Sequence, residues 1–377
     1  MSFNGEFIMP IKLSENALKE YLFNLYGCDV DICGFWQLGC EKNKGLKDLK
    51  GFGYGIPYVI EFRIKGETKR IVLETMRPGG FGHDFPSDRA QILLWQHSAF
   101  NNLPRHVRSV DVGAFTTNNE RIKSLGDCRE FFILTEYVEG KLYHVDLDRI
   151  KDSGEATKLD EERCLALSNY LAEIHSLKKD APGLYIRRIR ELVGHSECVM
   201  GLLDSYPTNL DYITESDLIE IERKCVEWRW RLKCKTYRLS QVHGDFHPWN
   251  IMFREGTDFT VLDRSRGEWG EPADDLTAIT INYIFYSLQK YGKLTGVFER
   301  LFRLFWENYL QKTRDMEILE IVPPFYAWRG LVVASPIWYP NLSREVRIKL
   351  LNFVKNVICE EKFIIDKINL YIQIPNK

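Results

Sequence analysis

The eight residues HGDFHPWN, at positions 243–250, gather two histidines, an aspartate and an asparagine in a segment where glycine and proline disfavour a regular helix. Such a group could form a metal site, a catalytic loop or only a polar turn. The flanking stretches LSQV, NIMF and FTVLD are predicted strands, the last two separated by the turn REGTD. A loop held by strand ends fixes polar side chains while its backbone can still bend, which favours a functional role.

The spacing of these polar residues is informative. Protein kinases carry a catalytic loop with the pattern H-R-D-x-x-x-x-N, in which the aspartate acts on the substrate hydroxyl and the asparagine holds Mg²⁺. His243, Asp245 and Asn250 repeat that spacing, with Gly244 in the place of the arginine. The later metal-binding aspartate of kinases has a counterpart in Asp263, 18 residues after Asp245.

Together these motifs resemble the aminoglycoside phosphotransferase and choline kinase family, which are small-molecule kinases with a protein-kinase-like fold. HGDFHPWN is similar to the family pattern H-G-D-x-H-x-x-N, and VLDRSRGEWGEPADDL is similar to I-D-W…G-x-P-x-x-D-L. LTEYVEG at 134–140 looks like the family's hinge, and YLAEIHSLK at 170–178 looks like its L-A-x-L-H-x helix. The resemblance is strong over 131–178 and 239–276 and thin after residue 292.

This resemblance implies the transfer of a phosphoryl group from ATP or GTP to a hydroxyl of a small molecule. Asp245 is then the residue that accepts or orients the hydroxyl, and His243 belongs to the same catalytic loop. Asp275 could simply cap its helix, but the family pattern implies that it also ties the loop to that helix. Asn250 and Asp263 would supply hard oxygen ligands, which suit Mg²⁺.

The first lobe is expected to bind the nucleotide. Gly53 and Gly55 in LKGFGYGIP fit a flexible loop whose backbone amides could approach phosphates, although glycines in hairpins are usually only turns. The resemblance adds Glu136 and Val138 from the hinge-like stretch, and Arg77 is a further candidate for the phosphates.

One position departs from the kinase pattern. Kinases carry a lysine on the third strand, whereas the matching position in RIVLETM is Glu74. Lys69, Arg70 or Arg77 could substitute for that lysine, the strand register could be shifted, or nucleotide binding could be altered. The helix acid that normally pairs with the lysine is best matched by Asp88.

The identity of the phosphoryl acceptor is harder to predict from the sequence. Arg264 and Arg266 follow the predicted metal ligand and would disfavour a cationic acceptor in favour of a phosphorylated or carboxylated one. The sequence also contains acidic and aromatic side chains that could bind a cationic acceptor, although aromatic residues at helical spacing more often belong to the core. These side chains are Glu268, Trp269, Trp328 and Tyr339. A small hydroxylated metabolite is the expected acceptor.

Composition narrows the class of protein. The chain has 377 residues, 45% of them hydrophobic, and a formal net charge of −2, which gives no long-range field for nucleic acid. Nine scattered cysteines without a C-x-x-C pair suit free thiols in a reducing compartment, so a cytoplasmic protein is expected. The N-terminus lacks the pattern of a signal peptide. The longest apolar stretch, 330–340, contains Pro336 and is far shorter than the ~20 residues that span a membrane.

Periodicity predicts a β-rich lobe followed by an α-rich lobe. Strands are expected at 33–39, 57–65, 70–76, 107–115 and 130–138, with a hairpin turn at 66–68. Helices are expected at 14–26 with Ser14 as N-cap and Gly27 as stop, and at 86–101, 160–175, 216–235, 274–291, 295–312 and 343–362. The predicted fold is therefore an α+β, bilobal, protein-kinase-like one, with a nucleotide-binding lobe at 1–138 and a helical lobe at 139–377 that carries the catalytic loop and acceptor site.

Two other functions compete with a kinase. A pseudokinase that binds nucleotide for regulation would explain Glu74, but Asp245 and its partners are all retained. A metal-dependent hydrolase would explain the density of His and Asp, but no second H-x-H or E-x-x-H cluster supplies further zinc ligands. His247 is therefore expected to brace the loop, and His175 is expected to be an ordinary core histidine.

Overall fold

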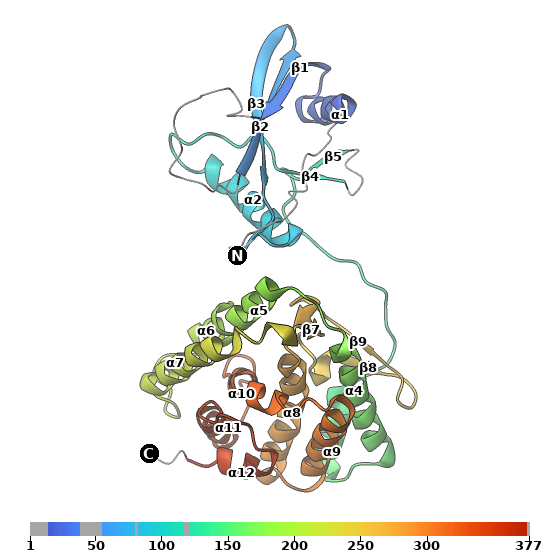
Figure 1. Ribbon diagram of the computed structural model, residues 1–377, viewed down its shortest axis with the longest axis vertical. Coiled ribbons are helices and arrows are strands. Elements are labelled where there is room, and N and C mark those ends of the chain that lie inside the picture. Colours follow the sequence, from blue (N-terminus) through green and yellow to red (C-terminus); the bar gives the residue numbers. More distant parts are fainter. Residues whose placement is uncertain (1–13, 38–54, 80–81, 117–120, 375–377) are drawn as a thin grey trace. The chain divides into compact units, whose positions relative to one another are not determined.

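The computed structural model divides into two compact units, residues 1–135 and 136–377 (Figure 1). It describes residues 14–37, 55–79, 82–116 and 121–374. No helix of these residues is long and apolar enough to cross a membrane. The eight cysteines among them are all free thiols.

The first unit is built on an antiparallel sheet in the order β1-β2-β3. Its main elements are α1 (Glu15–Tyr26), β1 (Val30–Gln37), β2 (Gly55–Ile64) and β3 (Glu67–Met76). Ser14 caps α1 by accepting a hydrogen bond from the Ala17 amide, and Gly27 ends it in the left-handed conformation, as predicted. The hairpin turn is Lys65-Gly66, slightly earlier than predicted; both residues have positive φ, as in a type I′ turn.

The predicted strand at 130–138 is wrong. No strand of the described residues pairs with this segment, so its backbone has no ladder partner, and Phe132, Leu134 and Tyr137 are almost fully exposed. An apolar run satisfied the strand pattern without a neighbouring strand to complete it. The predicted strand at 107–115 is also shorter than expected. The remaining elements of this unit are α2 (Pro86–Asn101), which matches its prediction, and the pair β4 (Gly113–Phe115) and β5 (Ile122–Ser124).

The second unit is mostly helical and has a single large core (Figure 1). The predicted helices are confirmed as α4 (Lys158–Ser176), α7 (Glu215–Leu232), α8 (Ala273–Tyr291), α9 (Gly296–Thr313) and α11 (Arg344–Val357). Further helices are α3 (Tyr143–Ser153), α5 (Pro182–Gly194), α6 (Val199–Asp204), α10 (Ile318–Ala334) and α12 (Ile368–Tyr371), with 3₁₀ turns at η1 (Thr236–Arg238), η2 (Pro248–Asn250) and η3 (Ile365–Lys367). Nearly every residue of α8 and α10 is buried, which makes these helices the centre of the unit.

Helix α10 contains two consecutive prolines, Pro323 and Pro324, which would normally break a helix. Pro323 cannot donate to the carbonyl of Leu319. That carbonyl instead accepts a 2.7 Å hydrogen bond from the amide of Phe363. The carbonyl freed by Pro323 is therefore satisfied by tertiary structure, and the helix continues to Ala334.

Short strands hold the segment 242–250. β7 (Ser240–Gln241) pairs with β10 (Trp269–Gly270), and β8 (Ile251–Phe253) lies between β6 (Lys141–Leu142) and β9 (Phe259–Val261). HGDFHPWN is thus a loop between two strand ends, as predicted. Among the described residues these strands share no sheet with β1-β2-β3, which agrees with two separate lobes.

Candidate active site

The loop that begins at His243 is fastened to the first turn of α8 by Asp275. The carboxylate of Asp275 is fully buried and accepts 2.7 Å hydrogen bonds from the backbone amides of His243 and Gly244. Burial alone would raise the pKa of Asp275, but a hydrogen bond from His175 and the nearby charges lower it below its usual value. Gly244 has a φ of +87°, a conformation that suits glycine and lets both successive amides face one carboxylate.

His175 supports Asp275 from the core. Its Nε2 lies 3.1 Å from the Asp275 carboxylate, and its Nδ1 lies 2.9 Å from the hydroxyl of Tyr309. The histidine is buried, as expected, but it does more than fill space because it fixes the acceptor of the loop amides. Sequence reasoning assigned it no chemistry, and only its position in the family-like helix pattern could have signalled this role.

Asp245 is largely buried at the centre of the loop. Its Oδ1 forms ion pairs with Arg329 at 2.6 Å and Arg266 at 3.1 Å. Within the described part of the chain, its Oδ2 has only looser neighbours, with Asn250 Nδ2 and His247 Nε2 each at 3.5 Å. Burial would raise the pKa of Asp245, yet the Arg329 guanidinium and the other cationic neighbours hold that pKa well below its usual range. Asp245 is therefore ionised at neutral pH.

Arg329, from α10, is a residue that sequence reasoning missed. Its Nη2 donates to Asp274 at 2.5 Å and to the carbonyl of Gly244 at 3.2 Å, in addition to the bond from Nη1 to Asp245. Trp328 lies under this group, with its ring centroid 3.9 Å from the Arg329 guanidinium. The predicted acceptor residue Trp328 is thus a core side chain that supports an arginine.

The two histidines of the loop brace it. His243 accepts a hydrogen bond from the amide of Asp245 at 3.3 Å, and burial lowers its pKa, so it is a neutral acceptor. His247 accepts from the amide of Trp249 at 3.2 Å and caps the turn η2. Neither histidine is directed to a second cluster of ligands: among the described residues no three His, Cys, Asp or Glu side chains converge on one point.

The predicted metal ligands lie at one end of the β8-β9 hairpin. The amide of Leu262 donates to the carbonyl of Asn250 at 2.8 Å, and Asp263 follows directly. Asn250 uses its Nδ2 to reach the Asp245 carbonyl at 3.1 Å, which leaves its Oδ1 available as a ligand. Asp263 is exposed and has a φ of +53°, which is uncommon for a residue other than glycine and often marks a functional site. These two oxygen donors fit a magnesium ion, which takes few protein ligands.

The residues predicted for the nucleotide are divided between the two units. Gly53 lies outside the described residues, Gly55 begins β2, and Arg77 directly follows β3. Glu136 is exposed and Val138 is half-buried in the extended segment before β6. Their assignment to the nucleotide stays a prediction.

The residue that stands at the expected position of the kinase lysine is on a strand, and its correspondence to that lysine stays a prediction. Glu74 lies on β3 opposite Pro57 and is exposed. Arg70, one of the candidate substitutes, is paired with Glu61 at 2.5 Å. Asp88 accepts a 2.8 Å hydrogen bond from the amide of Phe85 and so caps α2.

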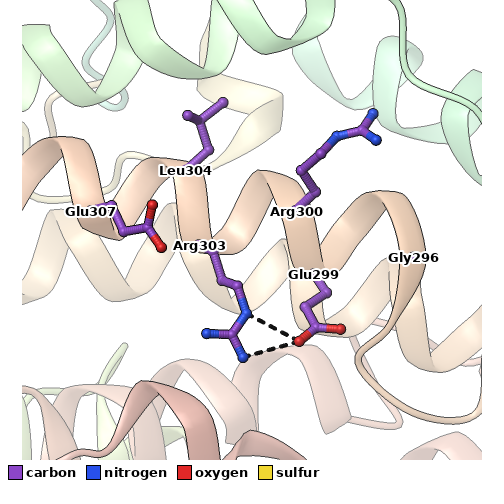
Figure 2. Close-up of a pocket in the computed structure, with 6 residues that line it drawn as sticks. All are labelled: Gly296, Glu299, Arg300, Arg303, Leu304 and Glu307. Atoms are coloured by element: carbon purple, nitrogen blue, oxygen red, sulfur yellow. Dashed lines mark hydrogen bonds and ion pairs between the residues drawn. The ribbon is translucent and has the colours of Figure 1, made fainter.

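Two pockets lie on the second unit. One, of about 410 Å³, runs along α9 and is lined by that helix alone, including Glu299 and Arg303, which pair with each other (Figure 2). The other, of about 480 Å³, is formed by α8 and the loop after α10 and is lined by Phe285, Gln289, Trp338–Ser343 and Val346. It adjoins the loop 243–250, because the ring of Tyr339 contacts both Phe285 and Trp249, with centroid distances of 5.1 and 6.4 Å.

Comparison with known proteins agrees with this geometry. Residues 93–290, more than half of the chain, match the phosphotransferase enzyme family known as APH. The chain belongs to this family. The family predicted from the motifs is therefore confirmed, and the α+β bilobal fold class is confirmed with it.

The solved structures to which this chain is similar include three that are described as kinases. An amicoumacin kinase, in complex with AMP-PNP and Ca²⁺, has 13% identity and a TM-score of 0.40, with coverage of 82% of this chain and 89% of that one. A choline kinase from Cryptosporidium parvum Iowa II has 12% identity and a TM-score of 0.32, with coverage of 96% and 87%. A Plasmodium vivax ethanolamine kinase has 15% identity and a TM-score of 0.36, with coverage of 86% and 84%. No curated protein sequence matches the chain.

Proposed function

We propose that this phosphotransferase moves the γ-phosphoryl group of ATP or GTP to a hydroxyl of a small molecule, with Asp245 acting on that hydroxyl. One observation carries the proposal. Asp245 is an ionised carboxylate with one oxygen engaged by guanidinium groups and the other only loosely contacted, on a loop whose backbone is fixed by Asp275. An ionised acceptor held in one orientation is what positioning of an attacking hydroxyl requires.

The chemistry follows from that arrangement. The acceptor oxygen forms a bond to the γ-phosphorus as the bond between that phosphorus and the bridging oxygen breaks, so the nucleoside diphosphate leaves. Asp245 receives a hydrogen bond from the acceptor hydroxyl and takes its proton late, because a carboxylate with a lowered pKa is a weak base. Asn250 and Asp263 would hold a magnesium ion, which when bound neutralises charge on the phosphates.

The pocket beside Tyr339 is the proposed acceptor region. It adjoins the catalytic loop, and the residues that line it carry aromatic, aliphatic, amide and hydroxyl groups but no charged side chain. Arg264 and Arg266 do not support the expected preference for an anionic acceptor. Arg264 donates to the carbonyls of Val242 and Glu268, and Arg266 pairs with Asp245. An uncharged acceptor with an apolar face is favoured.

The test is Asp245→Asn, which keeps the size of the side chain but cannot take the proton. Transfer to an acceptor found in a screen of alcohol-bearing metabolites should fall by roughly 10²–10⁴-fold, while the affinity for Mg²⁺-nucleotide changes little. Wild-type transfer by this variant would refute the role of Asp245. A collapse of nucleotide affinity would instead assign the residue to the metal site.

A second candidate, a nucleotide-binding protein without transfer activity, is favoured by the acidic residue at position 74 on β3. It predicts a Mg²⁺-dependent rise in melting temperature with nucleotide, together with no transfer to any acceptor and no nucleotide hydrolysis. If an acceptor stimulates nucleotide turnover and Asp245→Asn abolishes that turnover, the protein is a kinase.

A further inference from the structure

The polar contacts of Asp245 are divided unevenly between its two oxygens. Both guanidinium partners bind Oδ1, and the nearest donors to Oδ2 stand at 3.5 Å, longer than a well-formed hydrogen bond. An aspartate carboxylate rotates broadly about its last torsion, so its oxygens are equivalent unless a partner distinguishes them. In this loop the partners distinguish them clearly.

We propose that Arg329 is a positioning residue, which holds Oδ1 of Asp245 so that Oδ2 is the oxygen presented to the acceptor hydroxyl. This inference rests on the proposed function. It assigns a task to a residue 84 positions away from the catalytic loop, which no part of the loop motif contains.

The geometry of Arg329 suits this task. The planar guanidinium bonds to Asp245 through Nη1 and to both Asp274 and the Gly244 carbonyl through Nη2. It therefore contacts the side chain of Asp245, the backbone beside it and the start of α8 at once. A lysine ammonium is a point charge and cannot reproduce that planar fork.

Arg329 is also itself immobilised. Only 4% of the residue is exposed, and it stacks on Trp328, of which 1% is exposed. Arg266, the second partner of Oδ1, also lies over the ring of Trp328, at 4.4 Å, but it comes from the irregular segment after β9 and its side chain is 19% exposed, against 5% for Arg329. Of the two arginines, Arg329 is thus the one fixed to the core of the unit, and it sets the plane of the carboxylate.

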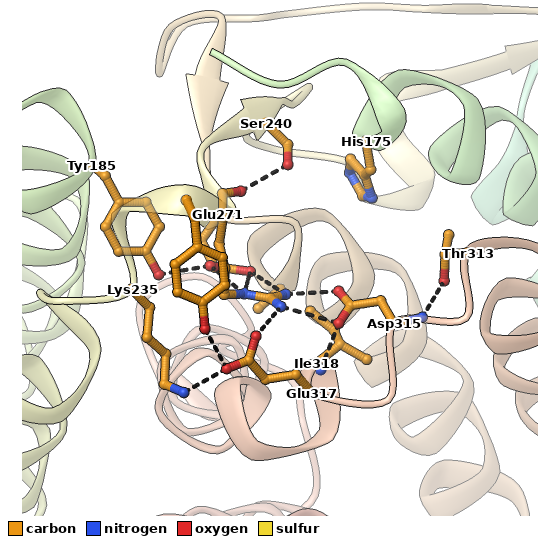
Figure 3. A network of polar contacts seen from close by, with 12 residues as sticks. His175, Tyr185, Lys235, Ser240, Glu271, Thr313, Asp315, Glu317 and Ile318 are labelled. Atoms are coloured by element: carbon orange, nitrogen blue, oxygen red, sulfur yellow. Dashed lines mark hydrogen bonds and ion pairs between the residues drawn. The ribbon is translucent and has the colours of Figure 1, made fainter. Parts of the chain in front are cut away.

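A purely structural role is the competing explanation, since Arg329 also neutralises Asp274. The chain offers a matched control in Arg238, which is likewise 4% exposed and pairs with Glu271, Asp315 and Glu317 at 2.8–3.0 Å. Figure 3 shows these three acidic side chains turned towards one another. None of its described contacts reaches Asp245. Replacement of Arg238 should therefore report what the loss of a buried guanidinium does to stability alone.

The experiment compares Arg329→Lys with Arg238→Lys. We expect Arg329→Lys to lower kcat by roughly 10–100-fold, because a misplacement of about 1 Å at a reacting group has an effect of this size. The KM of the acceptor and the affinity for Mg²⁺-nucleotide should change less than about threefold. Arg238→Lys should lower the melting temperature and leave kcat within about twofold of wild type.

A second variant keeps the test decisive if Arg329→Lys does not fold. Asp274→Asn removes the other carboxylate partner of Arg329 but leaves its bond to Asp245, so kcat should fall by a smaller factor at constant KM. Wild-type kcat in folded Arg329→Lys, or in Asp274→Asn where the lysine variant fails, overturns the inference. An equal loss of kcat in Arg238→Lys overturns it as well. An active Asp245→Asn would instead refute the proposed function itself.

Discussion

Replacement of Asp275 by asparagine tests how the catalytic loop is held. The Asp275 carboxylate accepts two backbone hydrogen bonds at 2.7 Å and one contact from His175 at 3.1 Å. Hydrogen bonds to a charged group contribute about 1.5–3 kcal/mol each, and a buried amide left without an acceptor costs a similar amount. An asparagine retains one acceptor oxygen and turns an NH₂ group towards a second donor. Against this, the neutral side chain no longer bears the cost of a buried charge.

The net expectation for Asp275→Asn is a loss of roughly 2–4 kcal/mol in the free energy of unfolding of the second unit, with a fall in kcat because the loop amides move. Urea denaturation followed by fluorescence measures the first quantity, and the transfer assay measures the second. Asp160→Asn is the matched control, since Asp160 is a buried carboxylate that caps α4 by accepting from Thr157 at 2.6 Å. It should lose stability but keep kcat. Unchanged stability and turnover in Asp275→Asn would refute the reasoning.

Three further predictions concern the magnesium ligands, the ion pairs of Glu317 and the acceptor pocket. Asn250→Ala and Asp263→Ala should each weaken nucleotide binding in the presence of Mg²⁺ more than in its absence, as measured by calorimetric titration. The pKa of Glu317 is lowered to about 2, because hydrogen bonds from Lys235, Tyr237 and Arg238 outweigh the effect of burial. The ionised Glu317 carboxylate therefore stabilises the fold above the unfolded pKa of about 4.5, and this stabilisation is lost as pH falls towards 2. Glu317→Gln should lower the free energy of unfolding by about 1–2 kcal/mol at pH 7. In urea titrations this difference from wild type should shrink between pH 4.5 and 2. Trp338→Ala should raise the KM of an apolar acceptor several-fold without a change in nucleotide affinity; an unchanged KM would exclude this pocket.

The parts predicted well from the sequence are those whose determinants are close together in the chain. Ser14 and Gly27 bound α1 because capping depends on neighbouring backbone groups. The position of HGDFHPWN between strands was predictable for the same reason: Asp245 and Asn250 lie between β7 and β8, and Asp263 follows β9 of the same hairpin. The catalytic and metal-binding roles of these residues stay predictions. A spacing of residues on a hairpin translates almost directly into a spacing of side chains.

Two partners of that loop, His175 and Arg329, were not assigned to it from the sequence because they come from distant segments. Three helices, α5, α6 and α7, separate His175 from the loop. Arg329 lies on α10, whose Pro323 and Pro324 argue locally against a helix. The hydrogen bond from the Phe363 amide to the Leu319 carbonyl, which a single sequence does not reveal, compensates for the bond that Pro323 cannot make. The wrong strand at 130–138 has a related cause, since a strand is defined by a partner that a single sequence does not reveal.

The contacts of Asp245 also bear on the kind of catalysis that the loop can perform. A carboxylate whose pKa is held low by two guanidinium groups is a poor general base, so deprotonation of the acceptor in advance of transfer is disfavoured. A phosphoryl group that passes through a loose transition state needs little nucleophile activation, and alignment of the hydroxyl with the phosphorus matters more. The arginines therefore lower the basicity of Asp245 while they fix the orientation of its carboxylate. On this reasoning, the rate lost in Arg329→Lys comes from the misorientation of one Asp245 oxygen, and the larger loss in Asp245→Asn adds the absence of a group that can take the proton.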